Sequence, residues 1–334
     1  MSGNFSNESA AQQNATCGLN LEEPSPVRIS KIFVLSTIFL LSLIGNTLIT
    51  IVVYKRKNLR KTVNYFIVNM AFSDIIFPLI AIPVRLAGIA TSSWKWYISG
   101  IVGFVFCKIL LFLQNVSLTV SVQSLVWIAV DRFVAVVFPM KIHLISTRFR
   151  VFAIISTWIV ALMINLTDLY TAVLVDFNGV ITCQYNIASL LYINFVYVRV
   201  SLIWIAPLIF MTILYCAIGA TLRRQDQALR QGTVHRNDQR KRKVIRMSLC
   251  VMVAFYLFAL IPIISAIIFV SHKWKTLMSH STFCLFYNMI SFIGFLPMYL
   301  SSTINPVICF IFVESYRHGL RELFSPCRRL RTTR

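Results

Sequence analysis

The stretch CKILLFLQNVSLTVSVQSLVWIAVDRFVAVVFP, from Cys107 to Pro139, decides the fold of this chain. Most of it is apolar, and near its end Asp131 stands beside Arg132. At about 1.5 Å per residue, a helix would hold Cys107 and Arg132 roughly 35–40 Å apart, slightly more than a bilayer core. Three polar residues lie between them: Gln114, Ser117 and Ser121. Such residues are costly in a membrane unless they face a packed interior or water, so the stretch is either a single anchor or one helix of a bundle.

The composition is that of a membrane protein that crosses the bilayer several times. Hydrophobic residues make up 57% of the chain and charged residues 13%, with a mean hydropathy of +0.75. The formal net charge of +21 could indicate nucleic acid binding. The basic residues, however, lie mainly in short gaps between apolar segments, which indicates positive loops beside anionic membrane lipid and no nucleic acid partner.

Seven long apolar segments follow a polar tail, at about 30–54, 63–89, 100–137, 150–172, 192–222, 243–270 and 283–313. The gaps after the first, third and fifth segments and the C-terminal tail are the basic ones. The sequence therefore predicts an extracellular N-terminus and a cytoplasmic C-terminus in the plasma membrane. It predicts an extracellular tail at 1–29, a transmembrane domain at 30–313, and a cytoplasmic amphipathic helix with a basic tail at 314–334.

The N-terminal tail contains three glycosylation sequons, which begin at Asn4, Asn7 and Asn14. Their clustering predicts a glycosylated extracellular tail. Two further sequons, at Asn115 and Asn165, fall within or beside apolar segments, where we expect no glycosylation.

The segment VLVDFNGVITCQY carries Asn178-Gly179 between β-branched and aromatic residues. This pattern predicts a β-hairpin with a type I′ turn, and an irregular loop is the alternative.

Four of the eight cysteines lie on or near the predicted outer side: Cys17, Cys107, Cys183 and Cys284. The exterior is oxidising, so an even number indicates disulfides. Position favours Cys107 with Cys183 and Cys17 with Cys284, although the other pairings stay open. Cys327 follows a basic amphipathic run and is a candidate for palmitoylation.

Asp74 is an acid at membrane depth and therefore a functional candidate. Five polar residues within the apolar segments could turn towards it: Asn46, Asn69, Ser121, Ser302 and Asn305. Such a cluster suits a monovalent cation such as sodium or a titrating proton, and a hydrogen-bonded structural acid is the alternative.

Over roughly residues 30–327 the chain closely resembles the rhodopsin-like (class A) G-protein-coupled receptors. The resemblance rests on motifs in a fixed order: Gly45-Asn46, Asn69, Asp74, Cys107, Asp131-Arg132-Phe133, Pro139, Trp158, Pro207, Tyr215, Pro262 and Asn305-Pro306. It implies an all-α membrane protein, a seven-transmembrane helix bundle with an extracellular β-hairpin and a short membrane-surface helix. That last helix would carry an apolar stripe of Tyr316, Leu320, Leu323 and Phe324.

The resemblance also implies roles for individual residues. Asp131 would hold Arg132 at rest, and Arg132 would meet a heterotrimeric G protein once released. Tyr215, Pro262, Asn305 and Pro306 would belong to the same switch, and arrestin would be a second cytoplasmic partner. Asp74, Ser121 and Asn305 would bind sodium, and Cys107 would pair with Cys183. Leu260 and Cys309 stand where the family usually has Trp and Tyr.

The outer halves of the segments indicate what the receptor binds. Gln114 replaces the Asp of amine receptors, and the last segment has no Lys for retinal. The stretches NYFIVNMAFSD and DRFVAVVFPMK are most similar to the neuropeptide branch. Arg85 and Arg199 would pair with an acidic group of a peptide, or snorkel, or pair internally with Asp168. Phe295 and Tyr299 would face the same pocket by resemblance.

We therefore expect a peptide-activated receptor that couples to a G protein and needs no cofactor, apart from a possible sodium ion at Asp74. A receptor for a lipid or nucleotide, a weakly coupling orphan and a transporter are the alternatives. The few histidines lie in loops or near segment ends, and no metal cluster is apparent, so the sequence does not predict an enzyme.

Overall fold

A computed structural model describes residues 23–59, 62–140, 146–177, 179–186, 190–229, 249–250, 252–254, 256–257, 260–261 and 280–324. Several predicted features lie outside these residues and stay predictions: Asn4, Asn7, Asn14, Cys17, Pro262 and Cys327. The side chain of Cys284 is also outside the described part, so its pairing with Cys17 stays a prediction as well.

Six helical columns in the described residues are long and apolar enough to cross a membrane. They are α2 (Ser25–Lys55), α3 (Thr62–Ala90), α4 (Gly100–Val137), α5 (Thr147–Thr171), the continuous run of α6 (Leu190–Val200), η3 (Ser201–Ile205) and α7 (Ala206–Leu229), and α9 (His280–Phe312). The described residues between 249 and 261, inside the predicted segment 243–270, are helical too. The predicted transmembrane segments are therefore confirmed wherever the structure describes them.

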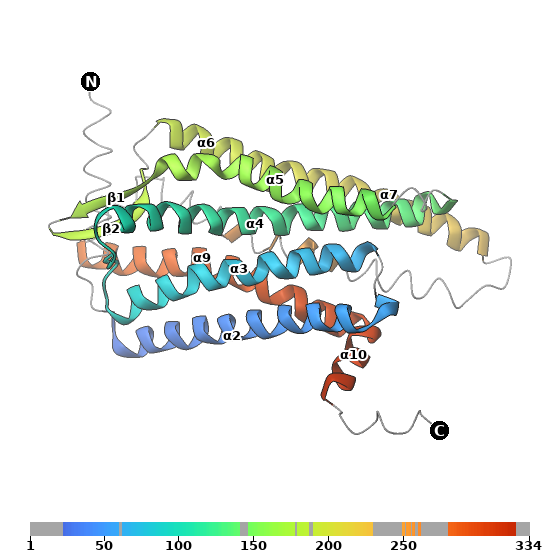
Figure 1. The fold of residues 1–334 in the computed structure, drawn as a ribbon, viewed down its shortest axis with the longest axis horizontal. Helices are drawn as coiled ribbons and strands as arrows, with labels where there is room; N and C mark the ends of the chain where they lie inside the picture. The colour runs from blue at the N-terminus through green and yellow to red at the C-terminus, as the bar shows by residue number, and fades with distance from the viewer. Residues whose placement is uncertain are drawn as a thin grey trace.

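The helices lie side by side, and α4 packs against α3, α5 and α7 (Figure 1). On the other side of α3, helix α2 packs against both α3 and α9. The interpretation of Cys107–Pro139 as a single membrane anchor is therefore wrong. This stretch forms most of α4, which is a central helix of the bundle.

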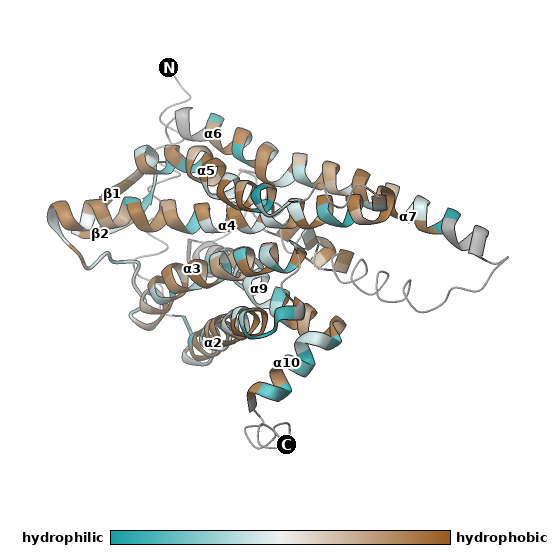
Figure 2. Ribbon diagram, turned by 45° about the vertical axis from the view of Figure 1, so that its right-hand side comes forward, coloured by the Kyte–Doolittle hydropathy of each residue, from teal (hydrophilic) through white to brown (hydrophobic). Residues whose placement is uncertain are grey.

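The helices are hydrophobic over most of their length (Figure 2), and the bundle buries polar side chains while it exposes large apolar ones, as expected of a protein surrounded by lipid. Asn46 and Asn165 are fully buried, whereas the side chains of Phe33 and Ile101 are 72% and 82% exposed. A soluble protein would bury the phenylalanine and expose the asparagine. Burial of Asn165 also agrees with the expectation that its sequon is not glycosylated.

The predicted hairpin is confirmed at one end of the bundle (Figure 1). Strand β1 (Ala172–Phe177) pairs antiparallel with β2 (Val180–Tyr185), and Phe177 lies opposite Val180. Two residues therefore form the turn, and Gly179 has a φ of +85°, which glycine adopts without steric cost. The type of the turn stays a prediction because Asn178 is not described.

Between α6 and α7 the helix widens by one residue, a feature that the sequence analysis did not predict. Residues Ser201–Ile205 form a π-helix, in which the N–H of Ala206 donates to the carbonyl of Ser201. The next residue, Pro207, has no N–H and its ring crowds the carbonyl four residues earlier, so the regular ladder is interrupted here.

The last helix, α10 (Glu314–Phe324), lies at the end of the bundle opposite the hairpin (Figure 1). Tyr316, a member of the predicted apolar stripe of this helix, packs into the bundle. The Tyr316 side chain is only 1% exposed, and its hydroxyl donates to the Asn64 side-chain oxygen at 3.1 Å. Burial raises the pKa of this hydroxyl above its ordinary value, so it stays protonated and available as a donor.

Candidate functional site

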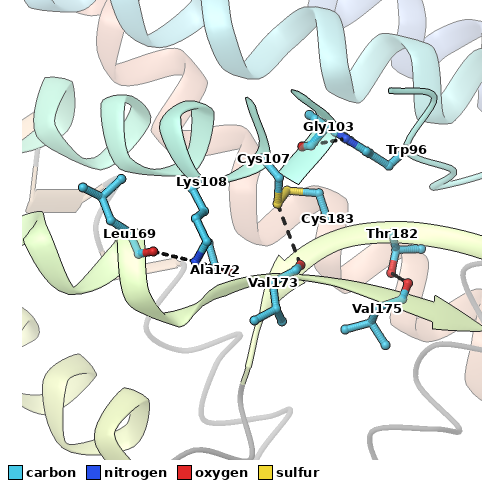
Figure 3. The surroundings of a disulfide bond; sticks show 10 residues. All are labelled: Trp96, Gly103, Cys107, Lys108, Leu169, Ala172, Val173, Val175, Thr182 and Cys183. Carbon is cyan, nitrogen blue, oxygen red and sulfur yellow. Dashed lines mark hydrogen bonds between the residues drawn. A yellow bond between two sulfur atoms is a disulfide. The ribbon is translucent and has the colours of Figure 1, made fainter. Parts of the chain in front are cut away.

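A disulfide fixes the hairpin to the start of α4 (Figure 3). Cys107 and Cys183 are bonded, with their Cα atoms 5.7 Å apart, as the resemblance implied. The Lys108 side-chain nitrogen donates to the backbone oxygens of Leu169 and Ala172, at 2.6 and 2.8 Å. The hairpin is therefore joined to both α4 and the end of α5 at this end of the bundle.

Two of the predicted ligand residues, Phe295 and Tyr299, come together around Arg85. The Arg85 guanidinium lies over the Phe295 ring, 4.5 Å from its centroid, and over the Trp94 ring at 4.6 Å. Its Nε donates to the Tyr299 hydroxyl at 3.2 Å. The sequence analysis missed Trp94, although an aromatic residue directly after the helix that carries Arg85 was a usable signal.

Arg199 has a different role from Arg85. Its guanidinium donates to the Asp168 carboxylate at 3.1 Å, and the Asp168 side chain is fully buried. This is the internal pair that the sequence analysis left open as an alternative. The Asn115 side chain adds hydrogen bonds to Asp168 at 2.9 Å and to the Tyr185 hydroxyl at 2.7 Å. The network joins α4, α5, α6 and the hairpin. It also engages the side-chain nitrogen of Asn115, to which a glycan would be attached.

Gln114 lies on α4, half-buried, next to this network. Within the residues that the structure describes, its side chain makes no hydrogen bond, whereas the neighbouring Asn115 makes three. Its predicted contact with a ligand stays a prediction.

In the middle of the bundle, Asp74 is held by two of the five polar residues predicted to reach it. The Ser121 hydroxyl donates to one carboxylate oxygen at 2.5 Å, and the Asn305 amide donates to the other at 2.6 Å. Ser73 extends the cluster with a hydrogen bond of 2.7 Å to the Ser121 hydroxyl. A buried carboxylate beside hydroxyl oxygens is a donor set that suits a hard cation, so the residues present fit a sodium ion.

Asn69 does not turn towards Asp74, so that expectation is wrong. Its amide nitrogen donates to the Ser124 and Thr157 hydroxyls at 2.9 and 3.2 Å, and its oxygen accepts from the Trp158 indole at 2.9 Å. These bonds join α3 to α4 and α5. Asn69 therefore holds three helices in register and takes no part in the acidic cluster.

Asn46 also does not reach Asp74, because its amide donates to the Ser302 backbone oxygen at 2.9 Å. That oxygen lies four residues before Pro306, which has no N–H to bond it. The backbone oxygen of Asp74 lies four residues before Pro78 and likewise lacks its usual N–H partner. The Ser42 hydroxyl donates to this oxygen at 3.1 Å. The remaining candidate, Ser302, donates its hydroxyl to the Tyr299 backbone oxygen.

At the opposite end from the hairpin, Asp131 and Arg132 form the predicted ion pair. The Arg132 Nε donates to the Asp131 carboxylate at 2.9 Å, and a terminal guanidinium nitrogen binds the same oxygen. Tyr215 of α7 is half-buried against the cluster of Val136 and Ile218, against which Phe133 of α4 also packs. The pair and Tyr215 thus lie at one end of α4 and α7, where the resemblance puts the G protein.

The sequence profile of the family described as "7 transmembrane receptor (rhodopsin family)" matches residues 45–309. Neuropeptide FF receptor 2 from Mus musculus is 28% identical over 90% of this chain and 74% of its own length. Neuromedin-U receptor 2 from Rattus norvegicus is 27% identical over 86% and 73%. A QRFP-like peptide receptor from Branchiostoma floridae is 29% identical over 65% and 58%.

Proposed function

Because the chain belongs to the rhodopsin family of seven-transmembrane receptors, we propose that an extracellular peptide activates it and that it signals through a heterotrimeric G protein. Membership of this family makes the chain a multi-pass membrane receptor and not an enzyme. The similar proteins are named as receptors for neuropeptide FF, neuromedin U and a QRFP-like peptide, which supports a peptide ligand.

The observation that carries the proposal is that the two ends of α4 carry different functional features. Its first turns are bonded to the hairpin through Cys107, and its last turns present the Asp131–Arg132 pair. A ligand at the hairpin end and a G protein at the other end would therefore act on the same helix. The basic loops predict that the Asp131–Arg132 end faces the cytoplasm.

Three further parts of the proposal concern the bundle and its surroundings. Sodium would be held by Asp74, Ser121 and Asn305, whose oxygens suit this ion. Tyr215, Asn305 and Pro306 would belong to the moving part that releases Arg132, together with Pro262. The cytoplasmic end would also receive arrestin, and the basic residues beside the bundle would contact anionic lipid.

The test is nucleotide exchange on a panel of Gα subunits in membranes that contain the receptor and are exposed to a peptide library. We expect at least one peptide to raise the exchange rate, and Arg132→Ala to abolish the increase at equal surface expression. Arg148→Ala, which removes an exposed arginine at the same end, is the matched control and is expected to keep most of the response.

Two outcomes would contradict the proposal separately. A response to a lipid or a nucleotide, with no response to any peptide, would refute the peptide ligand. A peptide response that survives Arg132→Ala unchanged would refute the assigned coupling residue.

A further inference from the structure

A pocket is lined by residues at the start of α2, around the end of α3 and in α9. These parts of the helices lie at the hairpin end of the bundle (Figure 1). The charged lining residues of the pocket are three cations and one carboxylate: Arg28, Lys31, Arg85 and Glu23. The only ion pair among them joins Lys31 to Glu23, at 2.5 Å. The pocket therefore has a net positive charge, and it already accommodates one carboxylate.

Two cations in this pocket have charges that no residue described by the structure matches. One is Arg28, which donates to the Ser92 hydroxyl at 3.1 Å, and the other is Arg85. Arg85 has no ion pair with a described residue, and its one hydrogen bond there, from Nε to the Tyr299 hydroxyl, leaves both terminal nitrogens with free N–H groups. Arg199 contrasts with it, because its charge is matched by Asp168. Of the two arginines predicted to bind a ligand, only Arg85 can meet an incoming anion without breaking an internal pair.

The surroundings of Arg85 restrict how an anion can approach. The rings of Trp94 and Phe295 lie against its guanidinium, at 4.6 and 4.5 Å from their centroids. Aromatic rings against a guanidinium hold its plane and reduce its contact with water. An anion must then approach the edge that carries the terminal N–H groups. That edge matches the two oxygens of a carboxylate, which it can bind in a bidentate manner.

We propose that Arg85 binds a carboxylate of the activating ligand, with an aromatic or aliphatic group of the ligand beside Trp94 and Phe292. The inference rests on the proposed peptide ligand and adds its chemistry, which is an anionic group next to an apolar one. The carboxylate comes either from the C-terminus of a peptide or from an Asp or Glu side chain.

The experiment measures the unfolding temperature of purified receptor in nanodiscs with two matched pairs of probes. The first pair is N-acetyl-Gly-Phe as the free acid and as the amide, which tests a C-terminal carboxylate. The second pair is N-acetyl-Glu-Phe-amide and N-acetyl-Gln-Phe-amide, which tests a side-chain carboxylate. We expect the acid of at least one pair to raise the unfolding temperature more than its neutral partner.

Variants assign the effect to Arg85. Arg85→Gln is expected to weaken binding of the acid about 10- to 100-fold, the usual range for one charge-assisted hydrogen-bonded contact, and to leave the neutral probe unchanged. Arg85→Lys keeps the charge without the planar fork and is expected to retain part of the preference. Lys95→Gln removes an exposed cation of the same end and is the control for general electrostatic attraction.

The inference is overturned if neither acid raises the unfolding temperature more than its neutral partner. It is also overturned if Arg85→Gln and Lys95→Gln weaken binding of the acid equally. Nucleotide exchange is measured on the same preparations with the peptide library. Exchange driven by peptides without any acid preference would refute this inference alone, whereas an acid preference without peptide-driven exchange would refute the proposed function alone.

Discussion

Pro306 and Asn46 show how single residues keep a proline-containing helix intact inside the membrane. The Asn46 amide donates at 2.9 Å to the Ser302 oxygen that Pro306 leaves without its usual N–H. We predict that Asn46→Leu, which keeps the volume but removes the donor, destabilises the receptor by about 1–3 kcal/mol. Thermal unfolding of purified protein measures this loss.

Two variants test the reason for the Asn46 prediction. Pro306→Ala restores an N–H to the helix, so Asn46→Leu should cost clearly less in that background than in the natural one. Thr50→Val removes a hydroxyl that bonds a carbonyl of its own helix, four residues back, and should cost little. An equal loss of stability on Asn46→Leu in both backgrounds would show that Asn46 does not act by bonding the carbonyl that Pro306 leaves unpaired.

The Asp74 cluster predicts a specific response to sodium. Asp74→Asn removes the charge that would hold the cation while keeping an oxygen near Ser121. We expect sodium chloride to raise the unfolding temperature above that in choline chloride at equal ionic strength, and Asp74→Asn to abolish the difference. If the variant keeps the full sodium effect, the ion binds elsewhere.

Contacts that depend on the face of one helix were predictable from the spacing of residues in the sequence. Contacts that depend on how two helices pack were not. Asn69 and Asp74 are five positions apart on α3, which is about 140° around a helix at 3.6 residues per turn, so the two cannot face one partner. The helical period alone would have corrected that expectation. The choice of Arg199 for Asp168, by contrast, depends on how α5 and α6 meet, which no period reveals.

Among the elements, α10 is held against α2 by a close approach at Gly319. A Cβ atom there would lie 2.6 Å from Val52 Cγ1, whereas a Cβ on Gly219 of α7 would meet nothing within 4 Å. We predict that Gly319→Ala loosens α10 at a cost of about 1–3 kcal/mol, the usual range for overpacking. Hydrogen exchange of residues 314–324 measures the change.

Gly219→Ala is the matched control for this prediction. It makes the same chemical change in an open place, where alanine is the better helix former by up to about 1 kcal/mol. We therefore expect no loss of stability and no change in the exchange of α10. Equal protection of α10 in Gly319→Ala and in the natural protein would contradict the close contact with Val52.

The hairpin was the element most fully predictable from sequence, because Asn178-Gly179 sets a two-residue turn and thereby the register that places Leu174 opposite Cys183. The π-helix of Ser201–Ile205 was not predicted. Pro207 predicts an interruption of the helical hydrogen bonds, which can produce either a kink or a widened turn. Packing against the neighbouring helices determines which of the two forms.

At the scale of the whole molecule, the sequence predicts the orientation of the chain in the membrane, with the N-terminus outside and the C-terminus inside. Basic residues gather in the gaps at one end, and α4 carries its Asp131–Arg132 pair to that same end. We predict that an epitope tag before residue 1 is detected on intact cells, and that a tag after residue 334 is detected only after permeabilisation. The opposite pattern would reverse the assignment of the ligand and G-protein ends.

Glycosylation gives an independent test of the orientation of the chain in the membrane. Replacement of Asn4, Asn7 and Asn14 by Gln should abolish the mass shift that a glycosidase produces, because these sequons lie in the predicted extracellular tail. Asn115→Gln should leave the glycan mass unchanged, since that side chain already bonds Asp168 and Tyr185 inside the bundle. It should instead lower thermal stability by about 1–3 kcal/mol, because the Asp168 carboxylate loses a buried donor. A glycan on Asn115 would require the start of α4 to open away from the hairpin, which the Cys107–Cys183 bond opposes.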